Sequence, residues 1–224
     1  MNKPTTVLIV DDHAFFRTVL SRPLEDSPHT NVVAAVGNGY EALDACHAHN
    51  PDVVLMDLNM TMMDGLTATA EIKRQYPQSK ILILTGMEDH TQAIAAFEAG
   101  AAGYMRKDSI TPSNLVTAIQ CVANGGVYID PSVFTVLLPS WYERKPQSSI
   151  SPLIVNLTAG EINLLRQVAL GRDNQKIAEM EEISKKTVAN KISMLFTEIG
   201  ANGRVQATHF ALRHAIIHLD ETAV

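Results

Sequence analysis

Residues 53–57 have the sequence Val-Val-Leu-Met-Asp, and this stretch decides the fold class. A run that is apolar throughout, instead of alternating with polar residues, indicates a strand buried on both faces, as in a parallel sheet. Four more short apolar runs have the same character, at residues 6–10, 32–36, 80–84 and 103–104. We therefore expect five parallel strands.

Between these runs lie segments with apolar residues at three- and four-residue spacing, which is typical of helices. They cover residues 14–24, 39–48, 64–75, 90–99 and 111–124. Five strand–helix units in residues 1–124 predict a doubly wound α/β domain. Asp130-Pro131 then predicts a short helix to about residue 138, and the proline-containing residues 139–156 read as a linker.

The signals after residue 156 are all helical. Thr158 and Glu161 form a capping-box pattern at the start of a helix that ends at Gly171. We expect a second helix capped by Asn174 and a third capped by Ser184, with a fourth over residues 204–218. The predicted organisation is an α/β domain at 1–124, a short helix and linker at 125–151, and a four-helix domain at 152–224.

Length and composition fit two globular domains. The chain has 224 residues, of which 46% are hydrophobic and 19% charged. Its apolar runs fall far below the about 18 residues that a membrane span needs, and no secretory signal is evident. Cys46 and Cys121 have no disulfide or metal spacing, so we expect a cytoplasmic protein without a membrane partner.

The formal net charge of −6 lies entirely in the first part of the chain. Residues 1–149 hold 10 Lys and Arg against 16 Asp and Glu, whereas residues 150–224 hold 8 of each. The helical part is therefore neutral, and the overall negative charge is no argument against a nucleic-acid partner there.

Polar residues follow four of the predicted strands. Because ligands of open α/β sheets bind outside the carboxyl ends of the strands, these residues are expected to converge at one edge. They are Asp11 and Asp12, Asp57, Thr85 and Lys107. Crowded carboxylates repel one another unless a cation neutralises them, and an all-oxygen donor set suits Mg²⁺.

This set meets the needs of phosphoryl transfer onto a carboxylate. Asp57 would be the nucleophile, Lys107 would supply positive charge, and Thr85 a hydroxyl donor. An alternative interpretation of the same residues is a Mg²⁺-dependent phosphatase with an aspartyl nucleophile. The motif typical of that class, however, is Asp-x-Asp after the first strand. We expect a regulator and not an enzyme. Turnover of small phosphomonoesters would favour the phosphatase instead.

Residues 5–124 resemble the receiver domain of two-component response regulators, whose fold is flavodoxin-like. The resemblance rests on Asp11-Asp12, Asp57, Met63-Asp64-Gly65, Thr85-Gly86, Tyr104 and Lys107. It implies that Asp57 accepts phosphate from a sensor histidine kinase. It also implies that Asp12, Asp57 and the backbone carbonyl of Asn59 hold Mg²⁺, and that Thr85 and Tyr104 act as a switch pair. Thr61 departs from the family, which usually has proline there.

The second and third helices of the C-terminal part form a helix-turn-helix pattern, in which the second of the two enters the DNA major groove. Six residues at or near the start of that recognition helix are candidate DNA contacts: Ser184, Lys185, Lys186, Thr187, Asn190 and Lys191. Lysines and hydroxyls suit phosphates, and asparagine suits an adenine edge.

Residues 152–218 resemble the LuxR-type domain of the NarL/FixJ regulators. The matching positions include Leu157-Thr158, Glu161, Gly171, Asn174, Lys176-Ile177-Ala178, Ile183-Ser184, Lys186-Thr187-Val188, Ile192, Gly200, Arg204 and Gln206-Ala207. The resemblance implies promoter DNA as partner and a homodimer formed largely through the last helix. Ala189 stands where a basic residue is common, Lys191 where histidine is common, and Thr197-Glu198 replace a usual Arg-Lys pair. Each basic residue that is lost removes a possible phosphate contact. Because the helical part has zero net charge, a regulator whose helical domain contacts proteins instead of DNA stays open.

Overall fold

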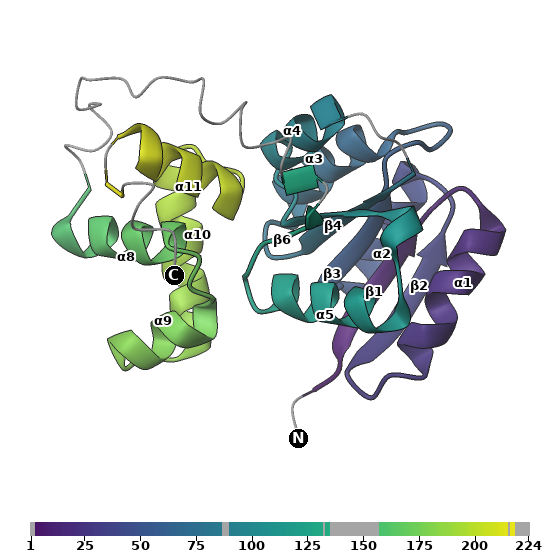
Figure 1. The fold of residues 1–224 in the computed structure, drawn as a ribbon, viewed down its shortest axis with the longest axis horizontal. Coiled ribbons are helices and arrows are strands. Elements are labelled where there is room, and N and C mark those ends of the chain that lie inside the picture. Colours follow the sequence, from purple (N-terminus) through teal and green to yellow (C-terminus); the bar gives the residue numbers. More distant parts are fainter. Residues whose placement is uncertain (1–2, 87–89, 132, 135–156, 215, 218–224) are drawn as a thin grey trace.

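The computed structural model describes residues 3–86, 90–131, 133–134, 157–214 and 216–217. Figure 1 shows two units, an N-terminal sheet with helices on both faces and a C-terminal helical unit. The predicted linker at 139–156 lies outside the described residues, as does most of the predicted short helix before it. No helix in the described part of the chain combines the length and apolar character needed to cross a bilayer.

The N-terminal unit contains a parallel sheet of six strands in the order β2-β1-β3-β4-β5-β6. The five predicted strands are confirmed as β1 (Thr5–Val10), β2 (Thr30–Val36), β3 (Val53–Asp57), β4 (Lys80–Thr85) and β5 (Gly103–Arg106). The expectation of five strands in total was wrong, because β6 (Tyr128–Ile129) pairs with Gly103 and Tyr104. A two-residue strand is too short to produce a recognisable period in the sequence.

Five helices connect the strands, close to the predicted ranges. They are α1 (Ala14–Glu25), α2 (Gly39–His49), α3 (Gly65–Gln75), α4 (His90–Glu98) and α5 (Pro112–Ala123). Two of them begin one residue later than predicted because Asp64 and Thr111 are N-caps, each accepting a hydrogen bond from a backbone N–H of the first turn. A short 3-10 turn, η1 (Lys107–Ser109), separates β5 from α5.

The sheet has a separate apolar core on each face, which explains why the strands are apolar throughout. Alternate residues of a strand point to opposite faces. In β1, Leu8 and Val10 pack in the core under α2, α3 and α4, whereas Val7 and Ile9 pack in the core under α1 and α5. Because both faces are covered, polar groups gather at the ends of the strands.

The C-terminal unit consists of four helices around its own core. They are α8 (Ala159–Ala169), α9 (Asn174–Glu181), α10 (Lys185–Glu198) and α11 (Arg204–Arg213). The predicted capping box of Thr158 and Glu161 and the Ser184 cap are confirmed. The predicted Asn174 cap was wrong, because Asp173 caps α9 by accepting from the backbone N–H of Lys176 at 2.7 Å. The helix predicted to reach residue 218 ends at Arg213.

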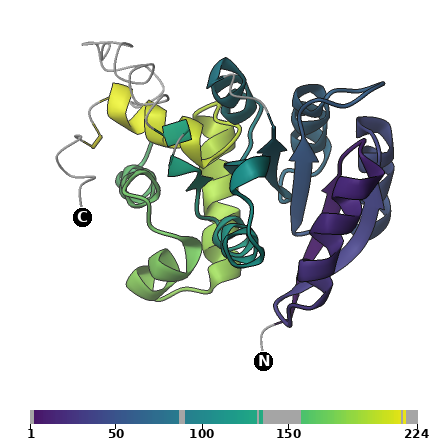
Figure 2. The ribbon, with the colours of Figure 1, turned by 45° about the vertical axis from the view of Figure 1, so that its right-hand side comes forward.

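The two units are docked beside β5 and β6, as Figures 1 and 2 show. The backbone N–H of Asn174 donates to the carbonyl of Asn124 at 3.2 Å. The side chains of Asn202 and Gln206 donate to the carbonyl of Glu98, the last residue of α4, at 3.2 and 2.9 Å. All of these contacts lie at the C-terminal ends of α4 and α5. These helix ends lie at the edge of the sheet opposite the carboxyl ends of the strands.

Candidate functional site

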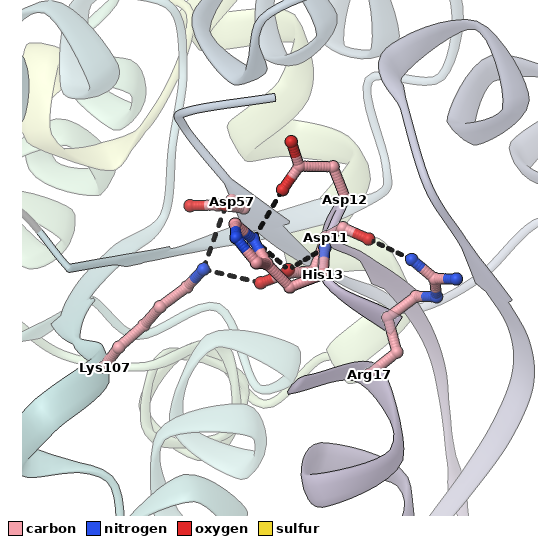
Figure 3. Close-up of polar contacts among 6 residues, drawn as sticks. All are labelled: Asp11, Asp12, His13, Arg17, Asp57 and Lys107. Carbon is pink, nitrogen blue, oxygen red and sulfur yellow. Dashed lines mark hydrogen bonds and ion pairs between the residues drawn. The ribbon is translucent and has the colours of Figure 1, made fainter. Parts of the chain in front are cut away.

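Three side chains from three strand ends meet at the carboxyl edge of the sheet (Figure 3). Asp11 follows β1, Asp57 is the last residue of β3, and Lys107 follows β5. The Lys107 ammonium lies 2.6 Å from Oδ2 of Asp11 and 2.9 Å from Oδ2 of Asp57. The parallel sheet therefore brings together groups that are separated by as many as 96 residues in the sequence.

Both carboxylates are deeply buried. The exposed fraction is 1% for Asp11 and 3% for Asp57. Burial raises the pKa of the Asp57 carboxyl above its ordinary value, and the hydrogen bond and charge of Lys107 oppose that rise. The negative charge of Asp11 raises it further, and a backbone hydrogen bond from Asn59 lowers it. Lys107 is thus the main group that opposes the effect of burial on this carboxyl.

The Lys107 ammonium also packs against the aromatic ring of Phe16. Its nitrogen lies 4.6 Å from the centre of the Phe16 ring, on α1, which is a cation–π distance. Arg17, also on α1, donates to the backbone carbonyl of Asp11 at 2.6 Å. Phe16 and Arg17 were missed in the sequence, because nothing in the spacing of an amphipathic helix marks the two side chains that reach the neighbouring strand ends.

Asp12 and His13 lie beside Asp11 and Asp57, and these four residues are called the acidic cluster below. Nδ1 of His13 lies 2.7 Å from Oδ1 of Asp12, and the backbone N–H of His13 donates to Oδ1 of Asp11 at 2.8 Å. One ligand atom from each of Asp11, Asp12, His13 and Asp57 lies within 4.8 Å of the others. Three carboxylates with one lysine leave negative charge uncompensated, so this donor set fits a divalent cation with oxygen ligands. His13 was also missed, although it directly follows the acidic pair.

The loop after β3 is shaped by a close backbone approach. A Cβ on Gly65 would lie 2.0 Å from the carbonyl oxygen of Asp57, so no other residue fits at this position without a shift of the loop. The backbone N–H of Gly65 donates to the carbonyl of Leu58 at 3.0 Å. This contact folds the Asn59–Asp64 loop back over the end of β3 and places Asn59 beside the Asp57 carboxylate.

Thr85 and Tyr104 were predicted to act with Asp57, and the structure places both inside the domain. Thr85 ends β4 beside β5 and is fully buried. The ring of Tyr104 is 2% exposed and packs against Phe97 of α4 with 6.3 Å between the ring centres. The Tyr104 ring therefore occupies an inward position under α4.

The six candidate DNA contacts lie together at the start of α10, and all are exposed. Ser184 caps the helix by accepting from the backbone N–H of Thr187 at 3.1 Å, so its hydroxyl is partly committed to local structure. Lys185 reaches the N-terminal unit, because its ammonium donates to Oδ1 of Asn124 at 2.5 Å. One side of the recognition helix thus faces the other unit, while Lys186, Asn190 and Lys191 are exposed.

Two family models match the chain. The model described as "Response regulator receiver domain" matches residues 7–120, and the model described as "Bacterial regulatory proteins, luxR family" matches residues 155–211. Each match falls within one of the two units of the fold.

Proteins of known classification resemble the chain over almost its full length. The transcriptional regulatory protein LnrK of Bacillus subtilis is 30% identical over 215 residues, which cover 94% of this chain and 97% of LnrK. The response regulator UvrY of Escherichia coli is 33% identical over 214 residues, which cover 96% of each chain. The crystal structure of the response regulator ChrA, from a heme-sensing two-component system, has a TM-score of 0.52 and 28% identity, and the alignment covers 96% of this chain and 99% of ChrA.

Proposed function

Because the chain belongs to the two-component response regulators that join a receiver domain to a LuxR-type DNA-binding domain, we propose that phosphorylation of Asp57 controls its binding to promoter DNA. The chain is a transcription regulator of a two-component system. The receiver implies a sensor kinase as partner, and the LuxR-type domain implies DNA binding. The domain limits that we propose are 1–124 for the receiver, 125–151 for the short helix and linker and 152–224 for the reader, with β6 (Tyr128–Ile129) of the connecting segment added to the receiver sheet.

Our assignment of Asp57 as the phosphoryl acceptor rests on its contact with Lys107 at the end of β3. An Oδ atom of Asp57 would attack the phosphorus of a kinase phosphohistidine, the phosphorus–nitrogen bond would break, and the imidazole would leave. The Lys107 ammonium would then pair with the transferred phosphoryl group, and the Thr85 hydroxyl would donate to one of its oxygens. Lys107 already spans Asp11 and Asp57, so it needs only a small movement to follow the new charge.

Mg²⁺ is the cation that the carboxylates would hold. Asp12, Asp57 and the backbone carbonyl of Asn59 are the proposed ligands, with Asp11 in the same cluster. Bound Mg²⁺ would neutralise the negative charge that the carboxylates and the incoming phosphoryl group bring together. The hard oxygen donors of this set favour Mg²⁺ over softer metals.

The docked arrangement suggests how phosphorylation would act on the reader. The Tyr104 ring packs against Phe97 of α4, and the side chain of Gln206 of α11 donates to the carbonyl of Glu98 at the end of α4. A movement of Thr85 towards the phosphoryl group, followed by the Tyr104 ring, would shift α4 and weaken this contact. Release would free α11, the helix through which the reader is expected to form a homodimer, and would free Lys185 for DNA.

A decisive test compares the wild-type protein with Asp57→Asn and with Asp44→Asn, which changes an exposed carboxylate on α2. Each protein is incubated with Mg²⁺ and a small-molecule phosphodonor. Mass spectrometry then measures phosphoryl uptake, and DNA selected from a random pool measures binding. We expect uptake and stronger DNA binding in the wild type and in Asp44→Asn. Uptake by Asp57→Asn, or phosphorylation that changes neither dimerisation nor DNA affinity, would refute the proposal.

A second candidate function follows from the neutral charge of the C-terminal unit. The reader would then act through protein contacts, because a neutral surface gains little from phosphate neutralisation. A salt titration of binding to random duplex separates the two functions. No measurable binding at low salt would favour the protein-contact function. The cytoplasmic location expected from the sequence stays a prediction.

A further inference from the structure

A cavity of about 600 Å³ lies between the two units, and four basic side chains line it. Lys73 and Arg74 come from the end of α3, Lys80 is the first residue of β4, and Arg204 is the first residue of α11. Among the described residues of its lining, Glu98 is the one acidic residue, and the carbonyl of Glu98 is engaged by Asn202 and Gln206. The lining therefore carries more basic than acidic side chains, although Arg74 is exposed and paired with Glu71 at 2.6 Å.

Three of these cations, Lys73, Lys80 and Arg204, are desolvated by burial, and Lys80 is close enough to affect the pKa of Lys73 and to be affected by Arg204. Burial lowers the pKa of Lys73 to about 7, and repulsion from Lys80 contributes to that shift. Burial also lowers the pKa of Lys80, with a further contribution from Arg204. A buried lysine without a counter-charge gives up its proton more easily, so an anion in the cavity would hold Lys73 and Lys80 in the charged form.

The donors of these side chains are not all used. Arg204 is anchored by the carbonyls of Val168 and Arg172 at 3.1 and 2.7 Å and by Asn174 at 2.9 Å. The Lys73 ammonium donates to the carbonyls of Pro77 and Ser79, which leaves one of its three donors. Within the described part of the chain, the Lys80 ammonium has neither a hydrogen-bond partner nor an ion-pair partner, while its backbone N–H donates to the carbonyl of Asp52.

We propose that this cavity binds a small multivalent anion, with Lys80 as its principal direct contact. The cavity volume lies within the roughly 300–1,000 Å³ range of small-molecule sites. Phosphate-bearing and polycarboxylate metabolites share the required chemistry, which is several oxyanion acceptors on a compact body. Because Lys73 and Lys80 belong to the receiver and Arg204 to the reader, the bound anion holds the two units together and opposes release of the reader.

Isothermal titration calorimetry of the full-length protein tests the site, with inorganic pyrophosphate and citrate as probes at constant ionic strength. At least one probe binds with one site per chain, and the probe that binds shows whether the anion is a phosphate or a carboxylate. Loss of a charge-assisted hydrogen bond predicts that Lys80→Gln weakens this binding at least about tenfold. Lys73→Gln serves as a second cavity variant, and Lys186→Gln removes an exposed cation of the recognition helix as the matched control.

Amide hydrogen exchange of the same proteins tests the link to docking. The backbone N–H of Asn174 bonds across the two units to Asn124, so its exchange reports their separation. The anion slows exchange at Asn174 in the wild type and in Lys186→Gln, but not in Lys80→Gln. Three results overturn the proposal: neither probe binds, Lys186→Gln weakens binding as much as Lys80→Gln does, or bound anion leaves the Asn174 exchange rate unchanged.

Discussion

Lys185, the first residue of the recognition helix, donates its ammonium proton to the side-chain oxygen of Asn124 at the end of α5. The contact joins a candidate phosphate-binding side chain of the reader to the receiver. If Lys185 contacts a DNA phosphate, as we propose, DNA and Asn124 compete for the same ammonium group. The docked arrangement would then lower DNA affinity directly, in addition to any steric effect of the receiver.

The first prediction concerns this competition. Asn124→Ala should raise the DNA affinity of the unphosphorylated protein two- to fivefold, because an exposed charge-assisted contact contributes about 0.5–1 kcal/mol. Fluorescence anisotropy with a selected duplex measures the change. Thr117→Ala alters an exposed residue of α5 outside the contact and should have no effect. Unchanged affinity in Asn124→Ala would show that Lys185 is not restrained by the receiver.

The second prediction separates the two roles of Lys107. Lys107→Met should lower phosphoryl uptake at least about tenfold, since the transferred group loses a charge-assisted partner. The same change should strengthen Mg²⁺ binding, because the cation no longer competes with an ammonium for Asp11 and Asp57. Kinetics of phosphorylation and a Mg²⁺ titration measure the two effects. Lys176→Met, on the reader surface, is the control, and a parallel fall in both quantities would contradict the assignment.

The third prediction concerns the loop that carries Asn59. Gly65→Ala should destabilise the receiver by about 1–3 kcal/mol, because its Cβ would meet the carbonyl oxygen of Asp57. Gly160→Ala introduces the same methyl group into open space on α8, where alanine favours the helix, so it should be neutral or stabilising. Urea unfolding of both variants measures the difference. Equal stabilities would mean that the loop moves aside without cost.

The fourth prediction concerns pH. The pKa of Lys73 is about 7 in the folded protein against 10.5 for an ordinary lysine. Below pH 7 both the folded and the unfolded chain hold this proton, and between the two pKa values only the unfolded chain holds it. Unfolding then takes up a proton, so the free energy of unfolding should rise as the pH increases from about 7 towards 10.

Urea unfolding at several pH values between 7 and 10 measures this slope. Lys73→Met should reduce it, and Lys80, whose pKa burial also lowers, contributes to the part that persists. Lys191→Met, which changes an exposed lysine of the reader, should leave the slope as in the wild type. A slope that is identical in Lys73→Met and the wild type would show that Lys73 is hydrated in the folded protein.

The amino-acid sequence alone was sufficient to predict five strands, the helices between them and the four helices of the reader, because each has a local signal. Apolar runs such as 53–56 mark buried strands, and the Thr158 and Glu161 pair marks a helix start. It was also sufficient to place Asp11, Asp57 and Lys107 at one edge, since parallel strands present their carboxyl ends on the same side. The neighbours Phe16 and Arg17 needed the packed structure, because their contacts depend on how α1 is rotated against β1.

The docking of the two units is a property of the tertiary structure alone. Its contacts join Asn124 to Lys185 and the carbonyl of Glu98 to Gln206, pairs that are 61 and 108 residues apart. Backbone carbonyls and exposed amides produce no recognisable pattern in a sequence. The cavity lined by basic side chains likewise forms only where α3, β4 and α11 meet. Local propensity and periodicity determined the elements and the strand edge that carries Asp11, Asp57 and Lys107, whereas long-range packing decided which side of the reader faces the receiver.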